Sequence, residues 1–124
     1  MTWIEIGKNH LQAARHTLQK HPRTCASRAY YAAHVVLAES LVQAGYTLAS
    51  GRQTPPHAQQ AKLIGSHLAG KGAHAVRELR RVIRRLYNYR LDADYRRTVT
   101  VDRARALESV RDACTLFQLL GCDQ

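Results

Sequence analysis

The chain has 124 residues, enough for one domain with a single hydrophobic core (residues 1–124) and too few for two. It carries 19 Lys and Arg against 9 Asp and Glu, and the net charge of +10 favours RNA, DNA, an anionic membrane or an acidic protein as partner. No apolar run is long enough to span a membrane, and the charged N-terminal segment has no signal-peptide core, so we expect a cytoplasmic protein.

A proline separates the first two predicted helices. Residues 3–20 place apolar side chains at helical spacings, and Thr2 begins a capping-box pattern with the glutamate three residues later. Pro22 ends this segment and fits the first turn of the next, which we predict over residues 23–44, with Gly45 as its C-cap signal. Alanine dominates the first half of the second helix, so another helix can approach it closely.

The longest loop is predicted over residues 45–56, which contain two glycines and two prolines. We expect Thr54 to cap a third helix, with Pro55 in its first turn. This helix is predicted to end near Leu68, where a Gly-Lys-Gly sequence follows.

Two more helices complete the predicted fold. The fourth covers residues 73–91, and the fifth begins near Thr100 with Asp102 in its first turn and stops at Gly121. Five helical segments with short connections, and no strand alternation of useful length, predict an all-α protein. The expected architecture is an antiparallel up-and-down helical bundle of four to five helices.

Arginines are concentrated in the fourth segment and the linker after it. Five of them follow one broad side of the helix, opposite its apolar stripe, and we call this set the arginine face. Guanidinium groups bind phosphate through paired hydrogen bonds, and nearby tyrosines can stack on unpaired bases, so this is a candidate nucleic-acid surface. The alternative is a solvated face on a basic protein. The arginine face is Arg77, Arg80, Arg81, Arg84 and Arg85, and Arg96 and Arg97 lie in the linker.

The seven histidines and three cysteines do not have metal-site spacing. No two histidines are four residues apart, the separation that places two imidazoles on one helical face, and no cysteine joins them. The sequence also lacks a phosphate-binding glycine loop and a serine nucleophile motif. We therefore expect no metal and no cofactor.

Residues 27–34 place polar side chains on a helix that otherwise looks buried. Arg28 and His34 are a candidate catalytic pair, because an arginine on the phosphate and a histidine as general acid or base suffice for metal-independent RNA cleavage. Six residues of helix separate them by about 9 Å and about 120°, so only a second, two-fold-related chain could bring the two together. The alternative is that His34 is a half-buried residue hydrogen-bonded to a neighbouring helix.

Three motifs, taken in order, resemble the HEPN superfamily, and most closely its small stand-alone branch. They are Ser-Arg-Ala-Tyr-Tyr-Ala at residues 27–32, His57 after the double proline, and R-x-x-A-D-Y at residues 90–95. The resemblance implies an all-α bundle and a homodimer. It also implies one of two roles: a metal-independent ribonuclease of a toxin–antitoxin or defence system, or a non-catalytic module. The ribonuclease branch carries R-x4-6-H late in the chain, and residues 85–95 contain no histidine.

The same motifs predict a polar link between the second and fourth helices. If the fourth helix continues to Tyr95, Arg90 and Asp94 share one face, and Asp94 is also a candidate partner for a buried Arg28. The link is either a structural tie or the floor of a pocket. Its candidate residues are Ser27, Tyr30, Tyr31, His57, Arg90, Asp94 and Tyr95, together with Arg28.

Two functions follow from these observations. In the first, the protein binds RNA through the arginine face and acts as a metal-independent endoribonuclease if Arg28 and His34 meet across a homodimer. In the second, it is a non-catalytic HEPN adaptor that binds a nucleotide or a nucleotidyltransferase-type protein partner.

Overall fold

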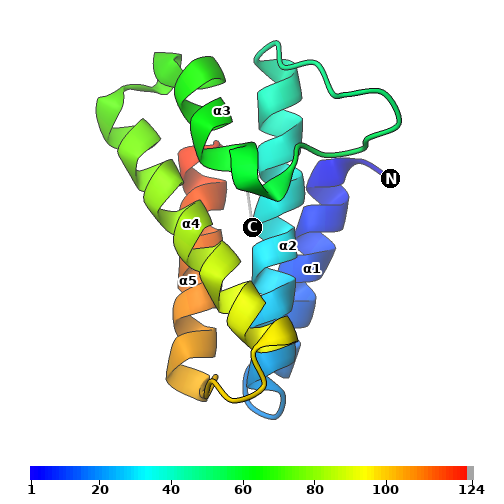
Figure 1. Ribbon diagram of the computed structural model, residues 1–124, viewed down its shortest axis with the longest axis vertical. Coiled ribbons are helices and arrows are strands. Elements are labelled where there is room, and N and C mark those ends of the chain that lie inside the picture. The colour runs from blue at the N-terminus through cyan, green and yellow to red at the C-terminus, as the bar shows by residue number, and fades with distance from the viewer. Residues whose placement is uncertain (123–124) are drawn as a thin grey trace.

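The computed structural model describes residues 1–122, which form a bundle of five α-helices without a strand (Figure 1). The all-α bundle predicted from the sequence is confirmed. No helix in this range combines the length and apolar composition needed to cross a bilayer. The helices are α1 (Trp3–Thr17), α2 (Pro22–Gln43), α3 (Gln60–His67), α4 (Ala73–Tyr95) and α5 (Arg103–Leu119), with short 3-10 turns η1 (His57–Gln59) and η2 (Ala69–Lys71).

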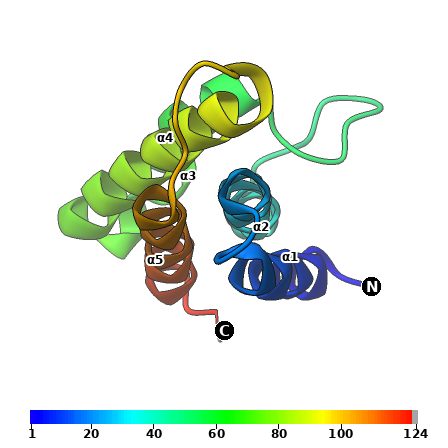
Figure 2. The same cartoon turned by 90° about the horizontal axis from the view of Figure 1, so that it is seen from below.

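The four long helices run alternately down and up, and short α3 lies beside the upper part of α4 (Figure 1). Figure 2 shows α2 at the centre, with α1, α4 and α5 around it, and it contacts all three. A helix surrounded on three sides has little surface left for a polar face. This explains why α2 carries buried residues around nearly its whole circumference.

Small residues allow α1 and α2 to pack closely, as the alanines of α2 predicted. Ala29, Ala32 and Ala33 are fully buried. On α1, Gly7 is buried, and a Cβ there would overlap the Val36 side chain and lie 3.1 Å from the Ala32 carbonyl oxygen. The two backbones therefore approach to a distance that only glycine permits at this position.

The prediction for the start of the third helix was wrong. Thr54 caps no helix and Pro55 lies in the loop, while the chain becomes helical only at η1 and α-helical at Gln60. The cause is the second proline, because a proline disfavours the helical conformation of the residue before it. Pro56 itself is extended, with φ −58° and ψ 137°.

The fourth helix is longer than predicted and continues to Tyr95. Two ion pairs at four-residue spacing support its last turns: Arg90 to Asp94 at 3.1 Å, and Arg96 to Asp92 at 2.9 Å. Such pairs stabilise a helix by a few tenths of a kcal/mol each, roughly 0.2–0.5.

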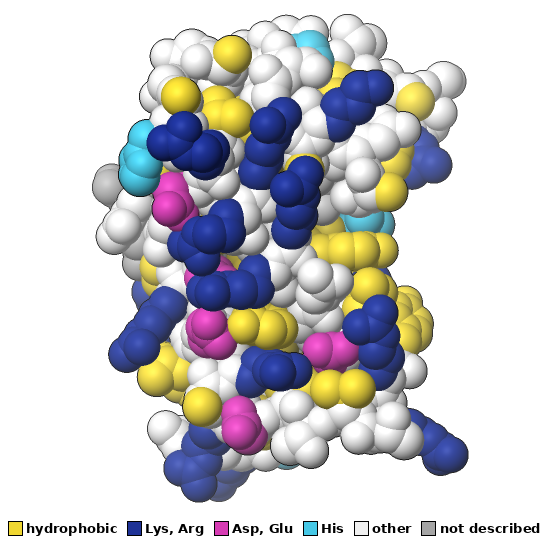
Figure 3. All heavy atoms as spheres, turned by 60° about the vertical axis from the view of Figure 1, so that its left-hand side comes forward, with side chains coloured by type: hydrophobic (Ala, Val, Ile, Leu, Met, Phe, Trp, Pro, Cys, Tyr) yellow, Lys and Arg dark blue, Asp and Glu magenta, His cyan; other side chains and the backbone are white. Residues whose placement is uncertain are grey.

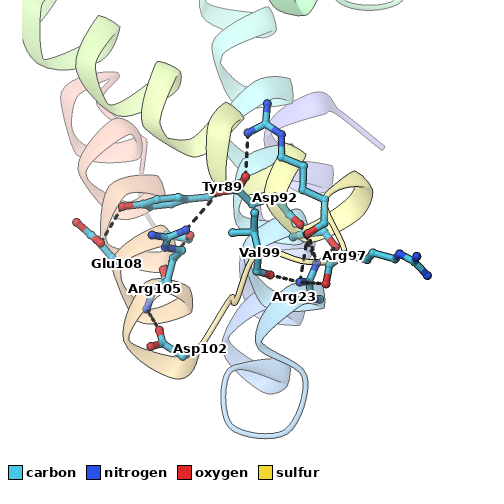
Figure 4. A network of polar contacts seen from close by, with 11 residues as sticks. Arg23, Tyr89, Asp92, Arg97, Val99, Asp102, Arg105 and Glu108 are labelled. Carbon is cyan, nitrogen blue, oxygen red and sulfur yellow. Dashed lines mark hydrogen bonds and ion pairs between the residues drawn. The ribbon is translucent and has the colours of Figure 1, made fainter.

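A second reason for this length is Arg23 of α2, whose guanidinium lies at the C-terminal end of α4 (Figure 4). The last carbonyl groups of a helix have no partner within the helix, and a buried one would be costly. Arg23 donates to the carbonyl oxygens of Asp92 at 2.7 Å and Ala93 at 3.1 Å. It also contacts the carbonyl oxygens of Arg96, Arg97 and Val99 in the linker.

The linker leads into α5, whose N-cap is Asp102 rather than a residue nearer Thr100. The Asp102 side chain accepts a hydrogen bond from the backbone N–H of Arg105 at 2.9 Å. The Arg105 guanidinium reaches Asp92 at 3.2 Å, and the Tyr89 hydroxyl donates to Glu108 at 2.8 Å (Figure 4). These contacts fasten α5 to the lower half of α4.

Candidate functional site

The arginine face lies on the outward side of α4. Figure 3 shows Lys and Arg side chains in a band down this part of the molecule, with fewer Asp and Glu side chains beside them, most of these in its lower half. Arg77, Arg81 and Arg84 are exposed, whereas Arg80 and Arg85 are partly buried. The predicted set is therefore on one helix, but its members are not equally available to a ligand.

Carboxylates neutralise part of this surface. Arg85 donates to both carboxylate oxygens of Asp112, each at 2.7 Å, and lies 3.1 Å from Glu108. Arg81 pairs with Glu78 at 2.8 Å. A bidentate pair with a buried carboxylate such as Asp112 leaves little of the Arg85 charge for a phosphate.

Within residues 1–122, Arg77 and Arg84 have no carboxylate partner. They are seven residues apart, which places them on nearly the same side of α4 and about 10 Å apart along its axis. Arg80 lies between them and is held by α3, because its Nε donates to the Ala61 carbonyl oxygen at 2.9 Å. Within the arginine face, the charge that has no acidic partner in the described residues therefore lies from Arg77 to Arg84.

The two linker arginines are not part of this cluster. Arg96 follows the last turn of α4, and nineteen residues of helix place it about 28 Å from Arg77. It is paired with Asp92, whereas Arg97 is exposed. The structure thus separates the predicted nucleic-acid set into two groups at opposite ends of α4.

Arg90 is the centre of the predicted link between α2 and α4. Its guanidinium lies between two tyrosine rings, 5.3 Å from the centroid of Tyr31 and 4.9 Å from that of Tyr95, and donates to both hydroxyls. Its Nε is 3.1 Å from Asp94, and the Ser27 hydroxyl donates to the same carboxylate at 3.0 Å. We call these five residues the Arg90 network.

Arg28 is not a member of this network. It is exposed on α2, and its guanidinium lies 3.4 Å from Nδ1 of His10 on α1 instead of pairing with Asp94. The expected ion pair between Arg28 and Asp94 is therefore wrong. The partners of the Asp94 carboxylate are instead Arg90, four residues earlier on the same helix, and the Ser27 hydroxyl of α2.

The proposed catalytic pair is also separated within one chain. His34 is only 3% exposed, and its Nδ1 lies 2.9 Å from the side-chain oxygen of Gln60. Burial lowers the pKa of His34 to about 4, so its ring is neutral near pH 7. In this chain, Arg28 points to solvent while His34 lies in the interior.

His34 belongs to a compact group that we call the tyrosine–histidine cluster. Its rings stack face to face or at a tilt: His34 and His57 at 4.4 Å, and His57 and Tyr87 at 5.8 Å between centroids. Tyr30, fully buried, contacts all three. With Gln60 this cluster joins α2, η1, α3 and α4 at one place.

Hydrogen bonds run through the tyrosine–histidine cluster in one direction. His34 donates to the Gln60 oxygen, and the Gln60 nitrogen donates to the Tyr30 hydroxyl at 2.7 Å. Burial raises the pKa of Tyr30, so its hydroxyl keeps its proton and donates it to Nδ1 of His57. The pKa of His57 is lowered by burial and by the nearby Arg90 and Arg52, and its neutral ring then carries the proton on Nε2.

These two groups show what the sequence could and could not reveal. His57, Tyr30 and Tyr31 were identified from the motifs, and the structure places Tyr31 with Arg90 and the other two with His34. Gln60 was missed, and its only signal is that it follows His57 by one turn after the double proline. Within residues 1–122 no group of histidine, cysteine or acidic side chains could hold a metal ion.

The fold defines the protein as an all-α helical bundle in which the Arg90 network connects α2 with α4. The family model of the HEPN domain matches residues 1–122, and the chain therefore belongs to the HEPN family. Comparison with curated proteins gave no match. Membership supports a nucleic-acid-associated function.

Proposed function

We propose that this HEPN protein binds RNA through the arginine face of α4. The observation that carries the proposal is the pair Arg77 and Arg84, which lie on one side of the helix and have no acidic partner in the described residues. Between them, Arg80 is held in place by α3. Arginines presented in this way bind phosphates without needing a particular base sequence.

The overall charge supports the same proposal. A net charge of +10 attracts a polyanion over a distance of several ångströms and raises the rate of encounter. Since family membership supports a nucleic-acid-associated function, RNA is the polyanion we propose.

Binding without cleavage is the role that the geometry favours. RNA cleavage by Arg28 and His34 would need both groups at one scissile phosphate, and burial of His34 works against this even across a homodimer. Nδ1 of His34 is hydrogen-bonded to Gln60 inside the bundle, so this nitrogen is not available to an RNA. A ribonuclease of a toxin–antitoxin or defence system is therefore the less favoured form of the proposal.

A non-catalytic adaptor for a nucleotidyltransferase-type partner is the second proposal. The same separation of Arg28 and His34 favours it, because an adaptor needs no catalytic pair. An acidic surface on such a partner would complement Arg77 and Arg84 in the way that RNA phosphates would.

The test is binding and cleavage of labelled single-stranded RNA at low salt in EDTA. We expect binding without cleavage, and Arg77→Gln/Arg84→Gln should weaken binding about tenfold. The matched control is Lys8→Gln/Lys20→Gln, which removes the same charge from exposed positions on and just after α1.

If both double variants weaken binding equally, net charge rather than the arginine face is responsible. If the wild-type protein does not bind RNA even at low salt, the RNA proposal fails and the adaptor remains. Cleavage that is lost in both Arg28→Ala and His34→Ala would instead establish the ribonuclease.

A further inference from the structure

A hollow of about 540 Å³ lies between α4 and the segment formed by η1 and α3. Its volume is within the range of ligand pockets, roughly 300–1,000 Å³. The polar and aromatic residues that line it are His57, Gln60, Lys62, Arg80, Arg84 and Tyr87. It thus connects the arginine face with the tyrosine–histidine cluster.

The positive charge of the hollow is not compensated from inside. Lys62, Arg80 and Arg84 contribute three cations, and none of the lining residues is acidic. Arg80 is fixed by its Nε bond to the Ala61 carbonyl oxygen, and one terminal nitrogen packs against Gly65 of α3, so its guanidinium lies at the wall of the hollow. The absence of a side chain at Gly65 makes this possible, because a Cβ there would overlap the Arg80 guanidinium.

The other wall of the hollow is aromatic. The rings of His57 and Tyr87 are nearly parallel, with an angle of 20° between their planes. Nδ1 of His57 is occupied by Tyr30, so Nε2 carries the proton and is the nitrogen available as a donor. Within residues 1–122 the Tyr87 hydroxyl also has no hydrogen-bond partner.

Cations beside flat rings are the groups that recognise a nucleotide: guanidinium groups bind its phosphate, and aromatic rings stack on its base. We propose that this hollow binds one unpaired nucleotide of RNA, with the phosphate at Arg80 and Arg84 and the base against Tyr87 and His57. The proposal rests on the RNA binding proposed above and narrows the ligand to single strands. In a duplex, the bases are stacked on one another and their faces are not available to a protein ring.

The experiment compares a labelled single strand of about eight nucleotides with a duplex of the same length, by fluorescence anisotropy at fixed low salt. We expect the single strand to bind about tenfold more tightly than the duplex. Arg84→Gln should remove most of this difference. Arg77→Gln is the matched control, because Arg77 is exposed on the same side of α4 but does not line the hollow.

A second variant tests the aromatic wall. Tyr87→Leu should weaken single-strand binding about fivefold or more and leave duplex binding unchanged. Because Tyr87 also packs against the core, circular dichroism must first show that the variant is folded. If it is not folded, the comparison of Arg84→Gln with Arg77→Gln decides the matter, because both of these side chains are exposed.

The nucleotide site in the hollow is contradicted if single strand and duplex bind equally and if Arg84→Gln and Arg77→Gln lose the same amount of affinity. RNA binding by the arginine face would still stand in that case. If no RNA binds, the proposed function fails. Calorimetry with adenosine monophosphate then tests separately whether the hollow binds a nucleotide. Binding of this nucleotide that is lost in Arg84→Gln supports the hollow, and absence of binding overturns it.

Discussion

Single polar side chains connect neighbouring helices inside this bundle. Arg90 is the best example, because its guanidinium ties two tyrosines and a carboxylate across the α2–α4 contact. His34 is a second example, since its ring stacks inside the bundle and its Nδ1 is bound to Gln60. Both residues have a structural reason to be polar that is independent of catalysis.

Stability should fall as the pH falls from about 6.5 to about 4. The folded chain keeps His34 neutral, with its pKa lowered from 6.5 to about 4 by burial, so the unfolded chain binds the proton first. A shift of this size corresponds to about 3 kcal/mol at most. The free energy of unfolding, measured in urea at several pH values, should show this loss between those two limits.

His34→Gln should make that pH dependence shallower, because the group that titrates differently in the two states is removed. His74→Gln, at an exposed position at the start of α4, is the control and should keep the wild-type dependence. Equal slopes in the two variants would contradict the buried, neutral state of His34.

Arg90→Met should lower the free energy of unfolding by about 2 kcal/mol. The change leaves the Tyr31 hydroxyl and the Asp94 carboxylate without their arginine partner, while methionine keeps much of the side-chain volume. Since the Arg90 side chain is only 11% exposed, solvent replaces few of these contacts. Urea unfolding is the measurement, and Arg84→Met, exposed on the same helix, should change stability by less than about 0.5 kcal/mol.

The helices differ in how much of them the sequence could predict. The capping box at Thr2, the break at Pro22 and the positive φ of Gly45 after α2 are local features, and the structure contains all of them. The end of α4 was only partly predictable, because it depends both on the local Arg90–Asp94 pair and on Arg23, which is about seventy residues away in sequence. The start of α3 was mispredicted although its signal was local, because Pro56 outweighed the Thr54 cap.

The candidate site also combines features that the local sequence predicts with features that depend on the fold. Periodicity placed the arginine face on one side of a helix, and this needed only local information. Which arginines are free depended on the fold, because Asp112 comes from α5 to pair with Arg85. The role of Gln60 depended on the fold too, since its contacts come from α2.

Gly7→Ala should destabilise the bundle by about 1–2 kcal/mol, although alanine is the better helix former. The added Cβ would meet Val36 and the backbone of α2, which cannot move without separating α1 from α2. Gly65→Ala is the control, because there the Cβ meets only the end of the flexible Arg80 side chain. Thermal and urea unfolding should therefore show a loss of stability in Gly7→Ala but not in Gly65→Ala. Equal stability of the two variants would contradict the close α1–α2 contact.

For the whole molecule, the folded chain arranges its charges unevenly. Within residues 1–122, most ion pairs join the lower half of α4 to its own residues or to α5, while of the arginines in the first half of α4 only Arg81 is paired and the hollow beside α3 has no acidic lining residue. Part of the excess of basic residues seen in the composition thus forms a local cluster of unpaired cations. Binding of RNA at this cluster is the central claim.

The salt dependence of RNA binding tests that claim most directly. For single-stranded RNA, each phosphate contact contributes about 0.7 to the slope of log K against log salt concentration. Arg77→Gln/Arg84→Gln should therefore reduce the magnitude of the slope by about 1.4 relative to the wild-type protein, while Lys8→Gln/Lys20→Gln leaves it unchanged. Parallel lines for the wild-type protein and the Arg77→Gln/Arg84→Gln variant would contradict RNA binding at the arginine face.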